Sequence, residues 1–227
     1  MPRVARLAPG GMLFHVLNRG VGRMQLFRKP GDYDAFERAI EKTLETCPLR
    51  ICSYTLMPNH WHLVVWPQRD VDLAAFKKLT ITHVRNWQVH RKRVGYGHVY
   101  QGRYKSFPIE TDEYFYHVVR YVEANPLRAN LVASPADWHW AWHWGSLWRR
   151  ERGDQAARGW LSDWPLPIPR NWLGVVASVQ PTEQLEQVRR SVVRGQPYGG
   201  MTWTERTAAA LGLESTLRAR GRPRKVE

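Results

Sequence analysis

Two histidines, His60 and His62, stand on either side of Trp61 in the apolar stretch NHWHLVVWP. Because side chains alternate along a β-strand, both imidazoles would lie on one face and Trp61 on the other. Two neighbouring imidazoles can share a divalent ion, and Mg²⁺ or Mn²⁺ can be held there when a phosphate supplies further oxygens. The alternative is that both histidines only cover the edge of a sheet, which is the commoner reading of an isolated pair.

A second group that can do chemistry is Tyr121 with Asn125, four residues later. On the helix expected here the two side chains lie together on the flank of an apolar stripe. A phenol in that place can act as a nucleophile, and an amide oxygen can complete a metal site. The plainer interpretation is a tyrosine at the margin of the core and an asparagine that stops the helix before Pro126. Tyr114, on the same flank, and Tyr116, across the helix, are rival nucleophiles.

The chain is strongly basic. Its 227 residues include 34 Lys and Arg against 20 Asp and Glu, so that the formal net charge is +14 and a polyanion is the expected partner. No run of about 20 apolar residues predicts a membrane span, and the N-terminus lacks the apolar stretch of a secretory signal. Two cysteines are too few for a disulfide framework. We therefore expect a cytoplasmic, nucleoid-associated protein with neither a membrane partner nor a small-molecule substrate.

The pattern of apolar residues predicts an α+β fold. Asp32 is expected to cap the first helix, and Thr111 and Asp112 to open the third, which Asn125 and Pro126 interrupt. The order β-α-β-β-α-β followed by a helix is the split βαβ, or ferredoxin-like, plan: a central antiparallel sheet with both crossover helices on one face. The expected strands cover 12–20, 49–58, 60–67 and 97–110, and the expected helices cover 32–45, 71–93 and 111–132.

The rest of the chain is less regular. We expect a first domain over 1–148, a connector rich in Trp and Pro over 149–180, and a small helical C-terminal extension with a basic tail over 181–227. The aromatic segment 137–148 either packs the last helix onto the sheet, the more usual role, or offers rings for unpaired bases. His139 and His143 are not expected to bind metal, because no acidic or thiol partner accompanies them.

Three segments in order, MPNHWHLVVWP, YQGRYKSFPI and YVEANPLRANLV, resemble the REP-associated tyrosine transposases. These are relatives of the single-strand transposases of small insertion sequences, within the HUH endonuclease superfamily. The resemblance covers about residues 8–148 and extends to TWTERTAAALGLESTLRARGRPRK, whereas 149–180 has no counterpart that we can match. It implies that His60 and His62 are metal ligands and that Tyr121 is the nucleophile. Asn125 stands where insertion-sequence relatives carry a glutamine, and is implied as a third ligand.

The resemblance also implies a reaction. Tyr121 would attack a phosphodiester of single-stranded hairpin DNA, leaving a 3′-hydroxyl and a 5′-phosphotyrosine link, with Mg²⁺ or Mn²⁺ as cofactor. One alternative is a palindrome-binding protein that does not cut. An RNA-binding protein is a weaker one, because the aromatic motif of RNA readers with this sheet is absent. The REP-associated branch acts as a monomer, which we expect here, with the helix-exchanged dimer of the insertion-sequence relatives as the alternative.

Basic side chains in three places are expected to neutralise DNA phosphates, although each alone can equally be part of a solvated surface. The places are the end of the second long helix, the strand that follows, and the tail RARGRPRK. The tail resembles minor-groove hooks but can equally be a disordered polyphosphate-binding segment. The residues are Arg85, Arg91, Lys92, Arg93, Arg103, Lys105, Arg220, Arg222, Arg224 and Lys225.

Overall fold

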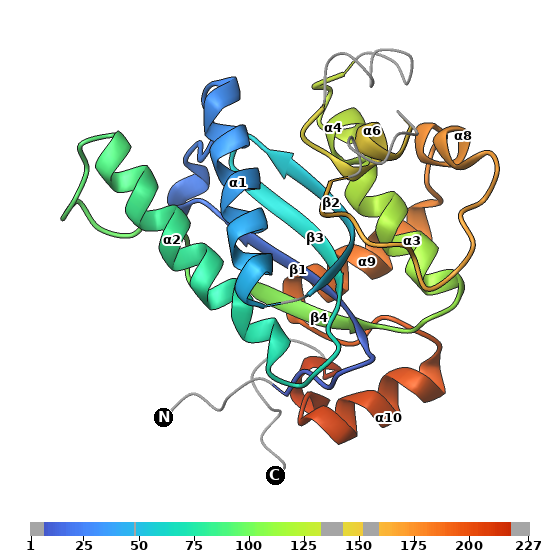
Figure 1. The fold of residues 1–227 in the computed structure, drawn as a ribbon. Coiled ribbons are helices and arrows are strands. Elements are labelled where there is room, and N and C mark those ends of the chain that lie inside the picture. The colour runs from blue at the N-terminus through green and yellow to red at the C-terminus, as the bar shows by residue number, and fades with distance from the viewer. Residues whose placement is uncertain (1–6, 48, 133–142, 152–158, 219–227) are drawn as a thin grey trace, which may run out of the picture.

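The computed structural model describes residues 7–47, 49–132, 143–151 and 159–218, and at its centre lies a sheet of four antiparallel strands (Figure 1). The order across the sheet is β2-β3-β1-β4, so each crossover helix joins two strands that have one other strand between them. This is the predicted ferredoxin-like arrangement. The strands are Leu13–Arg19 (β1), Arg50–Met57 (β2), His60–Trp66 (β3) and Lys105–Ile109 (β4).

The two crossover helices, α1 (Pro30–Thr46) and α2 (Ala75–His90), cover one face of the sheet, as predicted (Figure 1). Trp61 of β3 is fully buried beneath them. Its ring centroid lies 5.8 Å from that of Phe36 on α1 and 6.2 Å from that of Phe76 on α2. An aromatic ring buries a large apolar area, so this cluster contributes strongly to the core that joins both helices to the sheet.

The ends of both crossover helices differ from the sequence prediction. Asp32 is not the cap of α1 but its third residue, where its carboxylate accepts hydrogen bonds from the backbone N–H groups of Arg28 (2.8 Å) and Lys29 (3.3 Å). Pro30 can begin the helix because the first helical residue needs no N–H group. α2 is shorter than 71–93, because Asp72–Ala74 form a separate 3₁₀ turn and Lys92, with φ 51°, is left-handed.

The fourth strand is also shorter than the predicted 97–110. Before β4 the chain crosses the end of the sheet, where Tyr100 pairs with Gly20 in an isolated bridge. The Tyr100 hydroxyl accepts a hydrogen bond from Trp61 Nε1 (2.9 Å) and lies 2.6 Å from His83 Nδ1. Because Tyr100 is held in the core by these bonds, the segment before Lys105 does not alternate as a strand would.

Helix α3 (Glu113–Glu123) covers the opposite face of the sheet (Figure 1). Asp112 caps it as predicted, with its carboxylate accepting from the backbone N–H of Tyr114 at 2.9 Å. The helix ends at Glu123, and after Ala124 the residues Asn125–Arg128 form the short helix α4, which confirms the interruption at Asn125 and Pro126. The predicted apolar stripe is fully buried and consists of Phe115, Val118, Val119 and Val122.

The chain beyond α4 covers both edges of the sheet. Leu161 forms an isolated parallel bridge with Ile51 at the β2 edge, and Tyr198 forms one with Ile109 at the β4 edge. These bridges occupy part of each edge and reduce the backbone available for pairing with another chain. Of the aromatic segment 137–148, Trp144 stacks on Tyr33 of α1 with 4.1 Å between centroids, whereas His139 lies outside the described residues.

The remaining helices surround α3 and β4 (Figure 1). α8 packs against α3, and α9 packs against both α3 and β4. Their separation from the first 148 residues as distinct domains stays a prediction. None of the helices in the described residues is long and apolar enough to cross a membrane. The bounds are Ser146–Glu151 (α6), Trp172–Ala177 (α8), Thr182–Arg194 (α9) and Met201–Leu211 (α10), followed by a 3₁₀ turn at Glu214–Thr216.

Candidate active site

The histidine pair lies at the start of β3, on the sheet face that α3 covers. His60 is paired with Arg19 of β1, and His62 with Leu17, so the two imidazoles follow one another along one face while Trp61 faces α1 and α2. The rings are 4.9 Å apart between centroids and nearly perpendicular, at 85°. The shared face that the sequence predicts is therefore confirmed.

Each histidine has one ring nitrogen already engaged. His60 Nδ1 lies 2.6 Å from Oδ1 of Asn59, and His62 Nδ1 lies 2.9 Å from Nε2 of a third histidine, His15 on β1. Burial lowers the pKa of His60 to about 3 and that of His62 well below its ordinary value, and neighbouring cationic side chains add to both effects. The rings are therefore neutral at pH 7. A histidine binds metal through its neutral ring and is usually oriented by a hydrogen bond from its second nitrogen, which here leaves Nε2 of each ring for the ion.

Tyr121 of α3 lies against these rings. Its ring centroid is 5.8 Å from that of His62 and 6.2 Å from that of His15, in edge-to-face contact with both. Its side chain is buried, with 8% of the residue exposed. Burial raises the pKa of the phenol, and the positive charges of Arg128, Arg189 and Arg19, in that order, oppose this shift. The phenol thus lies in a shielded and cationic environment, beside the rings of His62 and His15.

Arg128, the last residue of α4, holds Tyr121 from the other side. Its guanidinium lies 4.5 Å from the centroid of the Tyr121 ring and donates a hydrogen bond to the Tyr121 carbonyl. Burial lowers the pKa of Arg128 to about 10, so it keeps its charge at pH 7. A cation over an aromatic face both orients the ring and favours negative charge nearby.

Asn125 reaches the same place through its amide. Its Nδ2 donates to the Tyr121 carbonyl at 3.1 Å, which leaves Oδ1, a suitable oxygen for Mg²⁺ or Mn²⁺, for another partner. In the described part of the chain no group of three or more His, Cys, Asp or Glu side chains is arranged to hold a metal. The two imidazole nitrogens and the amide oxygen are donors of the kinds that a divalent ion accepts when substrate oxygens supply the remaining ligands.

The two rival tyrosines are engaged elsewhere. Tyr114 makes edge-to-face contacts with His117 (5.7 Å) and Tyr198 (5.3 Å), beside the C-terminal helices. Tyr116 donates its hydroxyl hydrogen to the Pro167 carbonyl at 2.6 Å. Tyr121 is the tyrosine of α3 whose ring contacts His62 of the histidine pair.

A buried carboxylate, Glu123, anchors the tyrosine helix. It accepts hydrogen bonds from Ser53 of β2 (3.1 Å), Ser146 of α6, and Nε1 of Trp172 on α8 (2.7 Å). Burial raises its pKa, although these hydrogen bonds and Arg150 oppose the shift. One carboxylate thus joins α3 to the sheet and to two helices of the C-terminal region.

The predicted DNA-binding residues do not all lie on the face of the sheet that carries the histidine pair. Lys105 is exposed and does lie on that face, because it is paired with Leu17 of β1, which is paired with His62 on its other side. Arg91 is half-buried and bonded to Asp32 at 2.6 Å, away from that face. Arg85, Lys92, Arg93 and Arg103 are exposed. The tail residues Arg220, Arg222, Arg224 and Lys225 lie outside the described residues.

Three residues of the site were not predicted from the sequence, namely His15, Arg19 and Arg128. His15 and Arg19 reach the histidine pair only through the register of β1 against β3. Arg128 follows Tyr121 by seven residues and Asn125 by three, which is helical spacing and was a usable signal. This spacing was not used because the helix was expected to be interrupted at Pro126, before Arg128.

Comparison with known proteins gives the following matches. A family model described as "Transposase IS200 like" matches residues 10–125. A REP-associated tyrosine transposase of Escherichia coli (strain K12) is 25% identical over 135 residues, which are 57% of this chain and 74% of that protein. The fold is similar to a solved REP-associated tyrosine transposase bound to a REP hairpin, with a TM-score of 0.51 and 22% identity, over 74% of this chain and 94% of that one. The matched range 10–125 includes His60, His62, Tyr121 and Asn125.

Proposed function

This chain belongs to the family of IS200-like transposases, which are DNA-processing enzymes, and we propose that it cuts and rejoins single-stranded hairpin DNA through Tyr121. The observation that supports this most strongly is the contact between Tyr121 of α3 and His62 of β3 within a single chain. A nucleophile, two neutral imidazoles and two cations, Arg19 and Arg128, meet in one place. A protein that only binds DNA has no need of this combination.

The reaction is a transesterification at phosphorus. The phenolic oxygen of Tyr121 forms a bond to phosphorus, and the bond from phosphorus to the 3′ oxygen breaks. The phenol loses its proton, and the 3′ oxygen leaves as a hydroxyl by gaining one. The energy of the broken phosphodiester bond is retained in the 5′-phosphotyrosine link, so a later 3′-hydroxyl can attack that link, release Tyr121 and join two strands without ATP.

The residues of the site divide the work. Arg128 fixes the Tyr121 ring and, with Arg19, places positive charge where the phosphate gains negative charge. His60, His62 and Asn125 would hold a divalent ion, Mg²⁺ or Mn²⁺. That ion, when bound, would act as a Lewis acid on the scissile phosphate.

The proposed substrate is a DNA hairpin with single-stranded flanks. A structural relative is described as bound to a REP hairpin, and the net charge of +14 here suits such a polyanion. We further propose that one chain is sufficient, because Tyr121 contacts its own chain's histidines and the Glu123 bonds fasten α3 to the sheet. An exchange of α3 between two chains would have to form the bond between Glu123 and Ser53 across the two chains instead.

The test is formation of a covalent protein–DNA adduct. The full chain is incubated with labelled hairpin oligonucleotides and Mn²⁺ or Mg²⁺, denatured, and separated by electrophoresis. We expect an adduct with the wild type and with Tyr114→Phe, and none with Tyr121→Phe or in the presence of a chelator. An oligonucleotide shift on a native gel without any adduct would favour the alternative, a palindrome-binding protein that does not cut.

A further inference from the structure

A basic groove lies between the start of α1 and the end of α2, on the side of the sheet opposite to Tyr121. Its cavity of about 360 Å³ is lined by Arg28, Lys29, Trp87, His90, Arg91 and Arg93. A second cavity of about 380 Å³ continues from it along the two helices and adds Arg38. We call the first of these cavities, with its six lining residues, the α1–α2 groove.

The charge of this groove is largely uncompensated. Arg91 is bonded to Asp32 at 2.6 Å. Within the described part of the chain Arg28, Lys29 and Arg93 form no salt bridge, and all three are exposed. Three exposed cations around one cavity repel each other, and an anion in the cavity relieves that repulsion.

Aromatic side chains accompany these cations. The Trp87 ring forms one wall, fixed by a hydrogen bond from Nε1 to the Leu26 carbonyl at 2.9 Å. Tyr96, in the loop after α2, is 79% exposed, and the Arg93 guanidinium lies 5.8 Å from its ring centroid. Exposed rings among cations are typical of surfaces that bind unpaired nucleic acid, because bases stack on the rings while the cations contact phosphates. An acidic protein segment would explain the charges but not the exposed ring.

The groove and the active site lie at the same end of the sheet. The backbone N–H groups of Leu26 and Phe27 donate to the Pro58 carbonyl at 2.7 and 3.0 Å, immediately before Asn59 and His60. Arg28 and Lys29 come directly after this attachment, and Arg19 comes before it. A strand that leaves the histidine pair over the β2–β3 turn therefore passes from Arg19 toward the groove.

We propose that the α1–α2 groove binds backbone phosphates of the DNA substrate outside the reacting nucleotides, with Tyr96 as a stacking surface for an unpaired base. The inference rests on the proposed function for the identity of the polymer. It adds a second DNA contact on the face of the sheet that carries no catalytic residue.

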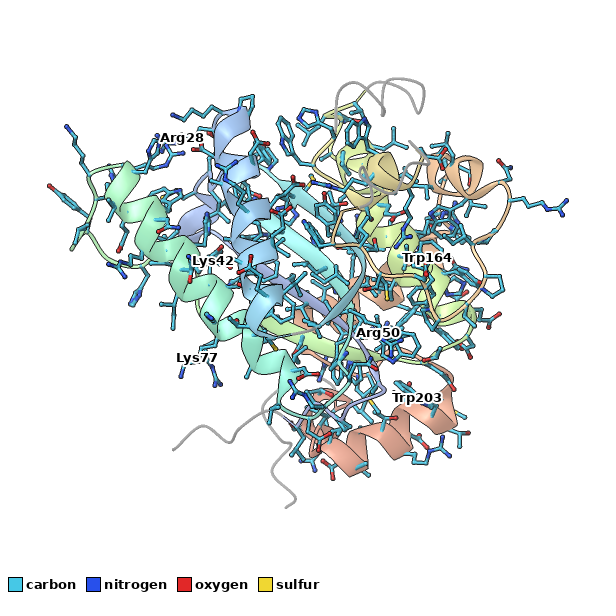
Figure 2. All side chains as sticks on the ribbon, viewed as in Figure 1. Arg28, Lys42, Arg50, Lys77, Trp164 and Trp203 are labelled. Atoms are coloured by element: carbon cyan, nitrogen blue, oxygen red, sulfur yellow. The ribbon has the colours of Figure 1, made fainter. Side chains whose placement is uncertain are left out.

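The experiment compares two double variants in the Tyr121→Phe background, so that cleavage does not consume the probe. One is Arg28→Gln with Arg93→Gln, within the groove. The matched control is Lys42→Gln with Lys77→Gln, which removes the same charge from exposed positions within α1 and α2. Figure 2 shows Arg28 near the start of α1 and both lysines farther from it. Binding of a fluorescent hairpin oligonucleotide with long single-stranded flanks is measured over a range of salt concentrations.

We expect the groove variant to lose two phosphate contacts. Each contact contributes about 0.7 to 0.9 to the slope of log affinity against log salt, so the slope should fall by about 1.4 to 1.8. At 0.1 M salt the affinity should fall by roughly 25- to 60-fold. The control should change by much less in both quantities. Tyr96→Ala should weaken binding to the flanked hairpin and leave binding to a blunt hairpin unchanged.

Equal losses in the two double variants would overturn the inference, because the charge would then act only through the net field. A loss seen with single-stranded RNA but not with DNA would also contradict it. With Tyr121 intact, the groove variant should still form the adduct at saturating DNA. If the wild type forms no adduct while the groove variant binds DNA more weakly than the control, the proposed cleavage fails and the groove assignment stands.

Discussion

Glu123 offers a direct test of how the tyrosine helix is held. Replacing it by alanine removes the acceptor of three buried donors, from Ser53, Ser146 and Trp172. The Ser146 hydroxyl can turn to the Tyr54 carbonyl, 3.2 Å away, and the Ser53 hydroxyl lies 3.0 Å from Ser146. Within the described part of the chain, Trp172 Nε1 makes no second hydrogen bond that could replace the one to Glu123.

The expected loss of stability in Glu123→Ala comes mainly from the unpaired Trp172 Nε1. A buried N–H group left without a partner costs about 1 to 3 kcal/mol. The lost side-chain volume adds about 1 to 2 kcal/mol, and removal of a buried charge offsets part of the sum. We therefore expect Glu123→Ala to lower the free energy of unfolding by about 3 kcal/mol. Glu123→Gln keeps the volume and an acceptor for Trp172, so it should stay within about 1 kcal/mol of the wild type.

Urea denaturation followed by tryptophan fluorescence measures these values, and repeating it over a pH series adds a second readout. Burial raises the pKa of Glu123 in the folded state. Its favourable contribution is therefore fully present below the unfolded-state pKa and decreases as the pH rises through the folded-state pKa. The stability of the wild type relative to Glu123→Gln should consequently decline as the pH rises above about 4.5.

Two results would refute this reasoning. If Glu123→Ala were as stable as Glu123→Gln, the three hydrogen bonds would not hold the helix. If the difference between the wild type and Glu123→Gln grew with rising pH, the carboxylate would be stabilised as an anion, opposite to the effect of its burial.

Three further predictions concern the site. Arg128→Met should slow adduct formation about tenfold in single-turnover assays, because the interaction of the cation with the Tyr121 ring contributes about 1 kcal/mol or more. Arg128→Lys should recover part of the rate, whereas equal rates in all three proteins would exclude a role for the guanidinium. His15→Ala should weaken Mn²⁺ binding by about 10- to 100-fold, because His62 loses the hydrogen bond that orients its ring. Electron paramagnetic resonance measures the binding, and an unchanged affinity would show that His62 does not need this bond. Mixing Tyr121→Phe with His62→Ala should restore no adduct, because Tyr121 contacts His62 of its own chain. Recovery of the adduct in the mixture would indicate helix exchange.

Much of the fold could be predicted from the sequence because its signals are local. Apolar spacing and the cap Asp112 define α3, and the Pro58-Asn59 turn separates β2 from β3. Strand alternation also placed His60 and His62 on one face. The ends of the elements were less predictable. Asp32 bonds to the N–H groups of Arg28 and Lys29 from the third helical position and not from the cap, and Tyr100 bonds to Trp61 and His83, which are distant in the sequence.

The support of the candidate site could not be predicted in the same way. His15 and Arg19 approach the histidine pair through the register of β1 with β3, which no single strand encodes. Glu123 looks like a polar residue on a helix, but residues up to 49 positions later bury it. Such contacts depend on how the C-terminal region packs, and the patterns of 149–180 gave no indication of it.

The central claim, that Tyr121 is the nucleophile, is tested most directly by locating the DNA on the protein. Trypsin cleaves after Arg120 and Arg128 and so separates Tyr121, in peptide 121–128, from Tyr114 and Tyr116, in peptide 106–120. After nuclease trimming of the adduct, mass spectrometry should find the 5′-linked nucleotide on peptide 121–128. Where trypsin fails to cleave after Arg120, the longer peptide carries the nucleotide, and its fragmentation should assign the nucleotide to Tyr121. A nucleotide on Tyr114 or Tyr116 would contradict the account.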